Sequence, residues 1–342
     1  MRWGRILGGL VILLALCLLP ETMTASSPSG QFVYKKQYSM GTVYEIVAYS
    51  PSMNRASQAI DAAFMAIAAL DHMMSNYDAQ SDLSRLNREA HFHAVRVPPD
   101  LFQVIQDSLV YSRASDGKYD VTVAPLVDVW KSAMRGGEPP SAARINRLRG
   151  CVGYRKVQLI PTDRIEFHSP CLRIDLGSIA KGYAVDRAVK ILRSQNIQSA
   201  LINAGGSTLY GMGAPPGRAG WSIRLRDPSG RVEPEVILRD DSVSTSEQEE
   251  ESLIDADEFG HIIEPITGQP VRSDFAVSVV AKTGTATDGL STTLFLMGPN
   301  NGAQLVRKLP DVAAIWVSPT GQTKVASTGP KILLHQSQKE NP

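Results

Sequence analysis

The sequence predicts an α+β fold, an irregular mixed α/β arrangement in which mixed sheets pack against helices. Helical and strand patterns alternate along the chain without the regular strand–helix–strand rhythm of a doubly wound sheet. The 342 residues are 43% hydrophobic and 20% charged, which is typical of a globular chain and excludes a disordered one. A G-x-G-x-x-G fingerprint occurs nowhere in the chain. These observations together disfavour a dinucleotide-binding parallel sheet.

The charge balance excludes a second class of protein. The formal net charge is +1 and aromatic residues make up 6% of the chain. A strongly basic surface is the electrostatic footprint of a nucleic-acid binder, and aromatic side chains are the stacking platforms of many RNA binders. We therefore expect no nucleic acid among the partners.

The first 26 residues have the pattern of an export signal. Arg2 and Arg5 precede an apolar run at 7–19, and small residues follow at 24–26. Leu16 stands before Cys17, where a lipoprotein signal has a small residue. We therefore expect an exported protein whose residues 1–26 form a signal peptide or a membrane anchor, with lipidation of Cys17 as the less favoured alternative.

We expect the globular domain to span residues 27–335, followed by a frayed tail at 336–342. Alternating side chains predict a strand pair over 31–49. Apolar residues with i, i+3, i+4 spacing predict a helix over 55–74, which Ser52 or Asn54 can cap. A second helix is expected over 101–115, where Asp116-Gly117 ends it.

The second half of the chain has shorter elements. They are a hairpin at 155–168, a helix at 180–194, short strands between 199 and 243, a strand at 275–282, a helix entry at 288–297 and a strand at 312–317. The acidic run 247–251 is interpreted as a solvated loop or a helix start. Cys151 and Cys171 flank the hairpin, and they can form a disulfide in an oxidising compartment or remain free thiols.

The loop 284–291 has the glycine spacing of a phosphate-binding loop but contains no lysine. Asp288 lies inside it, and a carboxylate beside a phosphate is repulsive unless a cation lies between them. Asp288, Ser291 and Thr292 offer hard oxygen ligands, which suit Mg²⁺ rather than zinc. The alternative is a helix start with Thr287 or Asp288 as its N-cap.

A second loop, 175–182, joins a strand to a helix, so that free backbone N–H groups face one spot. Lys181 could add a full positive charge there, or it could be a surface lysine beside an ordinary cap. The glycine turn 203–207 permits close approach of a ligand. His261 could be a base or a structural donor, and Tyr77 could be a core residue or a platform for a planar ligand.

Several segments, taken together and in order, carry a resemblance to a known family. They are S-M-G-T at 39–42, S-N-Y at 75–77, S-R-L-N at 84–87, D-G-K-Y-D-V-T-V-A-P-L at 116–126, I-D-L-G-S-I-A-K-G-Y-A-V-D at 174–186, N-A-G-G at 203–206, S-T-S at 244–246, H-I-I-E-P-I-T-G at 261–268 and A-T-D-G-L-S-T at 286–292. From about Tyr38 to Val325 the chain resembles the ApbE family, the FAD:protein FMN transferases.

The resemblance implies an ApbE-like fold and a Mg²⁺-dependent flavin transferase outside the bacterial cytoplasm, in the periplasm or at the outer face of the inner membrane. Such an enzyme moves FMN from FAD onto a threonine or serine of a target protein through a phosphoester bond and releases AMP. The acceptor implied is a subunit of a membrane redox complex.

The resemblance also implies the site residues. His261 and Asp288 would be catalytic, with His261 assisting the acceptor hydroxyl. The metal would be held by Ser178, Asp288, Ser291 and Thr292. Contacts to FAD would come from Met40, Tyr77, Lys118, Tyr119, Asp120, Asp175, Lys181 and Ile263.

Two positions depart from the family pattern. Glu264 stands where the family usually has aspartate, and Glu247 stands where a glycine is usual. Two other functions remain open at this stage. With water as the acceptor the same site would be an FAD pyrophosphatase, and without catalysis the chain would be an exported FAD-binding protein.

Overall fold

The computed structural model describes residues 31–136, 138–247, 262–271 and 273–335. Its centre is an eight-stranded sheet in the order β1-β2-β6-β7-β10-β11-β12-β13, in which every neighbouring pair is antiparallel. The strands are β1 (Gln31–Ser39), β2 (Thr42–Ser50), β6 (Ser199–Ala204), β7 (Thr208–Met212), β10 (Asp241–Ser246), β11 (Ala276–Ala281), β12 (Ala313–Val317) and β13 (Thr323–Ser327). The α+β class is confirmed.

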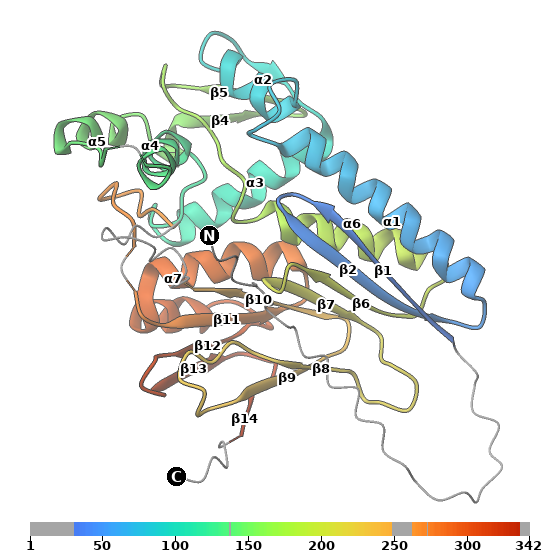
Figure 1. Cartoon of the computed structure of the whole chain (residues 1–342). Coiled ribbons are helices and arrows are strands. Elements are labelled where there is room, and N and C mark those ends of the chain that lie inside the picture. The colour runs from blue at the N-terminus through green and yellow to red at the C-terminus, as the bar shows by residue number, and fades with distance from the viewer. Residues whose placement is uncertain (1–30, 137, 248–261, 272, 336–342) are drawn as a thin grey trace, which may run out of the picture.

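Helices cover one face of this sheet, as Figure 1 shows. The long helix α1 (Met53–Met74) packs on β1 and β2, α6 (Ala180–Ser194) on β6 and β7, and α7 (Gly284–Val306) on β10 and β11. The opposite face of the central strands packs against a small sheet of β8 (Trp221–Arg224), β9 (Pro234–Leu238) and β14 (Leu333–Leu334). The apolar interior therefore lies in two layers, one on each side of the sheet.

A smaller lobe is inserted between β2 and β6 and lies above α1 and α6 in Figure 1. A three-stranded sheet and four helices form it. They are α2 (Asp82–Glu89), β3 (Val95–Arg96), α3 (Pro99–Ala114), α4 (Ala124–Met134), α5 (Ala142–Arg149), β4 (Val157–Ile160) and β5 (Arg164–Phe167), with a short 3₁₀ turn at Tyr154–Lys156. Its disulfide joins Cys151 to Cys171 across a Cα–Cα distance of 5.2 Å, so the paired alternative for the two cysteines is the correct one.

Most predicted elements are confirmed within a few residues, and Ser52 caps α1 as expected by accepting from Arg55 N–H. The start of α7 is different. Thr283 is its N-cap, and its side chain accepts from Ala286 N–H, so the helix begins at Gly284. The alternative that Thr287 or Asp288 caps this helix is wrong, because both residues lie inside its first two turns.

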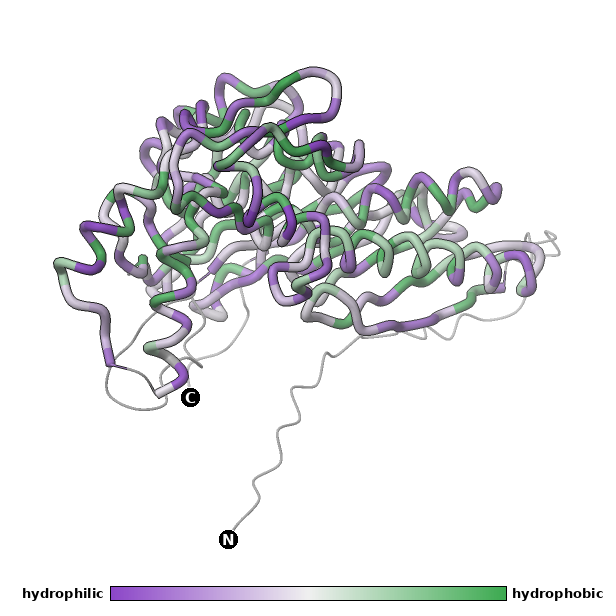
Figure 2. The backbone as a smooth tube through the Cα atoms, turned by 90° about the horizontal axis from the view of Figure 1, so that it is seen from above, coloured by the Kyte–Doolittle hydropathy of each residue, from purple (hydrophilic) through white to green (hydrophobic). Residues whose placement is uncertain are grey.

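In Figure 2 hydrophilic and hydrophobic residues alternate along the helical coils, as helices with one solvent-facing side require. Among the described residues, no helix combines the length and the apolar character needed to cross a bilayer. The predictions for the export signal 1–26 and the tail 336–342 lie outside the described residues, as does the acidic run beyond Glu247.

Candidate active site

The site begins where α6 and α7 meet through two glycines. A Cβ built on Gly182 would lie 2.1 Å from the carbonyl oxygen of Gly284, and one built on Gly284 would lie 2.6 Å from the carbonyl oxygen of Gly182. Neither position has room for a side chain. The first turns of α6 and α7 are therefore packed directly against each other, backbone to backbone.

Each helix also holds the other through a carboxylate. Asp186 of α6 accepts hydrogen bonds from the N–H groups of Gly284 (2.7 Å) and Thr285 (2.8 Å) and from the Thr285 hydroxyl (2.5 Å). Asp288 of α7 accepts from Gly182 N–H at 2.8 Å. Carboxylates satisfy the free donors at helix starts, so this reciprocal arrangement fixes where both helices begin.

Asp288 is 5% exposed and lies at the wall of a cavity. Burial raises the pKa of its carboxyl group, because the charged form loses water. The nearby Lys181 ammonium, the Gly182 N–H and a hydrogen bond from Thr208 oppose that rise. Asp288 is thus a buried carboxyl group that the fold keeps near two hydrogen-bond donors and one cation, on the wall of the cavity.

Behind Asp288 lies a row of buried hydroxyl groups between β10 and α7, which we term the hydroxyl row. Ser244 Oγ donates to Thr208 Oγ1 (2.9 Å) and approaches Thr287 Oγ1 (2.8 Å). Ser246 Oγ donates to Ser291 Oγ at 2.9 Å. Small hydroxyl side chains let the helix lie close to the strand while every polar atom finds a partner. The row connects β10 to the helix turn that carries Asp288.

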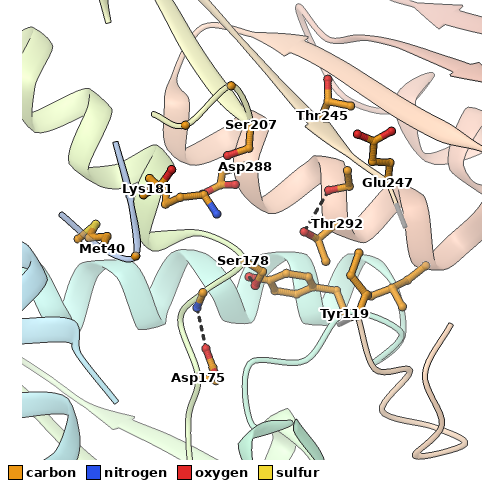
Figure 3. Close-up of a pocket in the computed structure, with 18 of the residues that line it drawn as sticks. Met40, Tyr119, Asp175, Ser178, Lys181, Ser207, Thr245, Glu247, Asp288 and Thr292 are labelled. Atoms are coloured by element: carbon orange, nitrogen blue, oxygen red, sulfur yellow. Dashed lines mark hydrogen bonds between the residues drawn. The ribbon is translucent and has the colours of Figure 1, made fainter. Parts of the chain in front are cut away.

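The cavity beside Asp288 has a volume of about 790 Å³. Figure 3 shows that its wall draws on both helix starts, the β1–β2 turn, the end of β10 and the segment before α4. Nine residues that the sequence predicted for the site line it: Met40, Tyr119, Asp120, Asp175, Ser178, Lys181, Ile263, Asp288 and Thr292. Segments more than 240 residues apart in the chain are therefore gathered here by the fold.

Asp175 and Ser178 are held by their own surroundings in the cavity wall. Asp175 Oδ1 accepts from Gly177 N–H at 2.8 Å, which tightens the loop before α6 (Figure 3). Ser178 Oγ donates to Tyr119 Oη at 3.1 Å. Burial raises the pKa of the Tyr119 hydroxyl, so it stays protonated at neutral pH.

Asp120 lines the cavity, but its carboxylate oxygens accept hydrogen bonds from other residues of the protein. Its oxygens accept from Thr122 N–H (2.8 Å), Thr122 Oγ1 (2.7 Å) and Tyr154 N–H (2.7 Å). These bonds offset the burial that raises the pKa of this carboxyl group. Asp120 therefore shapes the wall by holding its own loop.

Three of the predicted site residues do not line the cavity. Tyr77 is 79% exposed, and its hydroxyl accepts from Lys131 Nζ at 2.9 Å. Lys118 Nζ pairs with a carboxylate oxygen of Glu264 at 3.7 Å. Ser291 is buried in the hydroxyl row and donates to the Asp288 carbonyl at 3.0 Å. The predicted base His261 lies outside the described residues.

Other wall residues had not been predicted. They include Thr42, Lys131, Ser207, Arg224, Arg226, Thr245 and Glu247. Arg226 Nε and Glu247 Oε2 form an ion pair at 2.7 Å on the rim. The sequence did carry signals for some of them. Thr42 and Thr245 lie in segments that carry the family resemblance, Ser207 ends the glycine turn 203–207, and Glu247 begins the acidic run.

The possible metal ligands around the cavity are oxygen atoms, which suit a hard cation better than a soft one. Within the described part of the chain no cluster of three or more His, Cys, Asp or Glu side chains could hold a metal ion alone. Asp288 and Thr292 lie one helical turn apart, and both line the cavity. An oxygen-poor protein site of this kind fits Mg²⁺, which keeps water or substrate phosphate oxygens in its shell.

Comparison with known proteins identifies relatives over most of the chain. The model of the ApbE family matches residues 40–316. A protein of Klebsiella pneumoniae named FAD:protein FMN transferase is 30% identical over 261 residues, which cover 75% of this chain and 80% of that protein. A protein of the same name from Salmonella typhimurium is 27% identical over 300 residues, covering 84% of each chain.

Solved structures with the same fold are also found. The flavin transferase ApbE of Vibrio cholerae superposes with a TM-score of 0.77 at 26% identity, covering 87% of this chain and 98% of that one. An ApbE protein of Thermotoga maritima gives a TM-score of 0.78 at 26% identity, with the same coverage. The similarity therefore extends through the sheet, the helices and the smaller lobe.

Proposed function

The chain belongs to the ApbE family, and from this membership and the cavity around Asp288 we propose that it is a flavin transferase with FAD as substrate and a protein as acceptor. The observation that carries the proposal is the placement of Asp288. A buried carboxylate faces a cavity of about 790 Å³, which lies within the size range of small-molecule sites of roughly 300–1,000 Å³.

We propose that Mg²⁺ is required. Asp288 and Thr292 would hold the ion from α7, with oxygens of the Ser178 loop nearby on the same cavity wall. When bound, the ion would neutralise phosphate charge and polarise the phosphorus under attack. Lys181 lies close enough to Asp288 to oppose the burial effect on the pKa of that carboxyl group, so its ammonium is placed to face the same phosphates.

The reaction we propose joins an acceptor hydroxyl to the FMN half of FAD. The oxygen of a threonine or serine attacks the phosphorus on the flavin side, the bond between that phosphorus and the bridging oxygen breaks, and AMP leaves. The hydroxyl proton passes to a base, for which His261 is proposed. A neutral hydroxyl is a poor nucleophile, and a positioned base raises its reactivity.

We also propose that the enzyme acts outside the bacterial cytoplasm, at the periplasmic side of the inner membrane, on a subunit of a membrane redox complex. The signal-like pattern of residues 1–26 supports export. The disulfide between Cys151 and Cys171 supports an oxidising compartment, since such bonds are rare in the cytosol.

The test is to incubate the purified chain with FAD, Mg²⁺ and an extract of envelope proteins, with a parallel sample containing EDTA. Mass spectrometry is expected to find an FMN adduct on a threonine or serine, and chromatography an equal amount of AMP, both absent with EDTA. AMP with free FMN and no adduct would identify a pyrophosphatase instead. FAD that stays intact for hours with Mg²⁺ and several acceptors would leave only a binding protein.

A further inference from the structure

This inference rests on the proposed protein acceptor and concerns how that acceptor is held. The strand β1 is the first strand of the eight-stranded sheet, with β2 on one side and no strand on the other among the described residues. Its register with β2 is continuous over nine residue pairs, from Gln31↔Ser50 to Ser39↔Thr42, without a bulge. A long regular edge is a template for an added strand unless a protein protects it.

The register shows which backbone groups of β1 are free. The carbonyl oxygen of Val43 accepts from Gly205 N–H at 3.0 Å, so the backbone groups of Val43 point toward β6 and away from β1. Its partner Tyr38 then belongs to a pair without hydrogen bonds to β2. By the two-residue repeat, the N–H and C=O groups of Phe32, Tyr34, Lys36 and Tyr38 all point outward from the edge.

The side chains of these four residues lie on the sheet face away from α1. Phe32, Tyr34 and Tyr38 are 56%, 44% and 72% exposed. Lys35, which lies between Tyr34 and Lys36, has its side chain on the other face of the sheet, where its ammonium pairs with Asp61 of α1 at 2.6 Å. A strand added to this edge would therefore find open backbone groups flanked by exposed aromatic rings.

The edge leads directly to the cavity. The strand β1 ends at Ser39, and the following turn residues Met40 and Gly41 line the cavity wall. A neighbouring strand lies about 4.8 Å from its partner, so a segment paired with 34–38 and continued past the turn arrives at the cavity mouth. The other edge of the sheet, β13, contributes nothing to the wall.

We propose that the β1 edge binds the acceptor protein as an added β-strand and thereby delivers its threonine or serine to the cavity. Alternating N–H and C=O groups along an edge are matched by an extended polypeptide backbone, which identifies the partner as a peptide segment. The side chain at the end of the added strand then enters the cavity while the segment before it stays on the edge.

The variant that tests this is Lys36→Pro, because proline removes one outward N–H without touching a hydrogen bond to β2. The matched control is Val325→Pro on β13. Hydrogen bonds run from Ser318 N–H to Gln322 O (3.0 Å) and from Thr328 N–H to Val312 O (2.9 Å). By the two-residue repeat, the backbone groups of the even-numbered residues of β13 point toward β12, and those of the odd-numbered residues point outward. The N–H of Val325 therefore also points outward, but far from the cavity.

Lys36→Pro is expected to raise the KM for the acceptor about tenfold, with kcat and the affinity for FAD unchanged, because an edge hydrogen bond is lost and the ring blocks pairing. Val325→Pro should leave all three within about twofold, since β13 takes no part in this mode of binding. FAD affinity is read from flavin fluorescence. Equal acceptor KM values for Lys36→Pro and the wild type would overturn the proposal.

Hydrogen–deuterium exchange of the wild-type chain decides the matter even if Lys36→Pro does not fold. The probe is an envelope protein isolated by its binding to the wild-type chain. At saturation it should slow exchange in the peptide spanning 31–39 and leave the peptide spanning 323–327 unchanged. Unchanged exchange at 31–39 would overturn the docking site. If the wild type binds the acceptor in this way but transfers no FMN, the proposed function fails while the docking site stands.

Discussion

The two aspartates at the α6–α7 junction, half-buried Asp186 and buried Asp288, differ in how many hydrogen bonds their oxygens already accept. Asp186 accepts three hydrogen bonds from the first turn of α7 and lines no part of the cavity. Asp288 accepts one backbone N–H and a hydrogen bond from Thr208, and it lines the cavity. Burial raises the pKa of both carboxyl groups. Under the proposed function, we therefore expect Asp186, whose oxygens are taken up by α7, to hold the two helices together, and Asp288 to take part in the reaction.

The two aspartates keep these hydrogen bonds only while α6 and α7 stay in contact, and Gly182→Ala breaks that contact. The new methyl would meet the Gly284 carbonyl, a backbone atom that cannot turn aside. We expect a loss of more than about 3 kcal/mol in the free energy of unfolding, measured by urea denaturation. The control is Gly206→Ala in the same cavity wall, where nothing lies within 4 Å. Its positive φ should cost only about 1 kcal/mol.

Asp288→Asn should abolish most of the activity and leave the fold intact. Transfer of FMN is expected to fall by a factor of about 1,000 or more, because a neutral amide cannot hold a divalent cation against a phosphate. The fold should remain, since an amide oxygen can still accept from Gly182 N–H. Circular dichroism checks the fold and the AMP assay checks turnover. Turnover within tenfold of the wild type would remove Asp288 from the centre of the mechanism.

Asp186→Asn should have the opposite effect, with a larger loss of stability than of activity. The amide places an NH₂ group against the donors of Gly284 and Thr285, so we expect the unfolding free energy to fall by about 1–3 kcal/mol. Transfer should decrease far less than in Asp288→Asn when both are assayed well below their melting temperatures. Loss of transfer in a variant that keeps its stability would mean that Asp186 acts in the chemistry.

The smallest effect concerns pH. Burial raises the pKa of the Asp288 carboxyl group, so the metal-free fold is favoured by its protonated form and loses that contribution as pH rises through the raised pKa. Mg²⁺ needs the ionised form. At an excess of about 100-fold over Kd, Mg²⁺ should raise Tm by about 5 °C at pH 8. The shift should shrink toward pH 5 and be absent in Asp288→Asn at either pH.

Local patterns were enough to predict the secondary structure that builds the site. Helical spacing and capping residues predicted α1, α3 and α6, and alternation predicted the β1–β2 and β4–β5 hairpins. Asp288 was predicted because a carboxylate in a phosphate-like loop is unusual on chemical grounds. The start of α7 was misplaced because the Thr283 cap resembles the cap that Thr287 could have formed.

Long-range pairings could not be predicted in the same way. No local feature signals that β2 pairs with β6 or that β7 pairs with β10. The bond between Asp186 and the start of α7 joins residues 98 positions apart. One available signal was overlooked: serines at 242, 244 and 246 repeat every two residues, which predicts a polar strand face that needs buried partners.

The hydroxyl row has a consequence for how this enzyme can move. A helix that slides along a sheet does so in steps of one turn, about 5.4 Å. Such a step in α7 would separate Ser244 from Thr287 and Ser246 from Ser291 at once, leaving several orphaned hydroxyls in a dry interior. Since apolar contacts can be exchanged for similar ones but these hydrogen bonds cannot, the hydroxyl row fixes the position of α7 along β10.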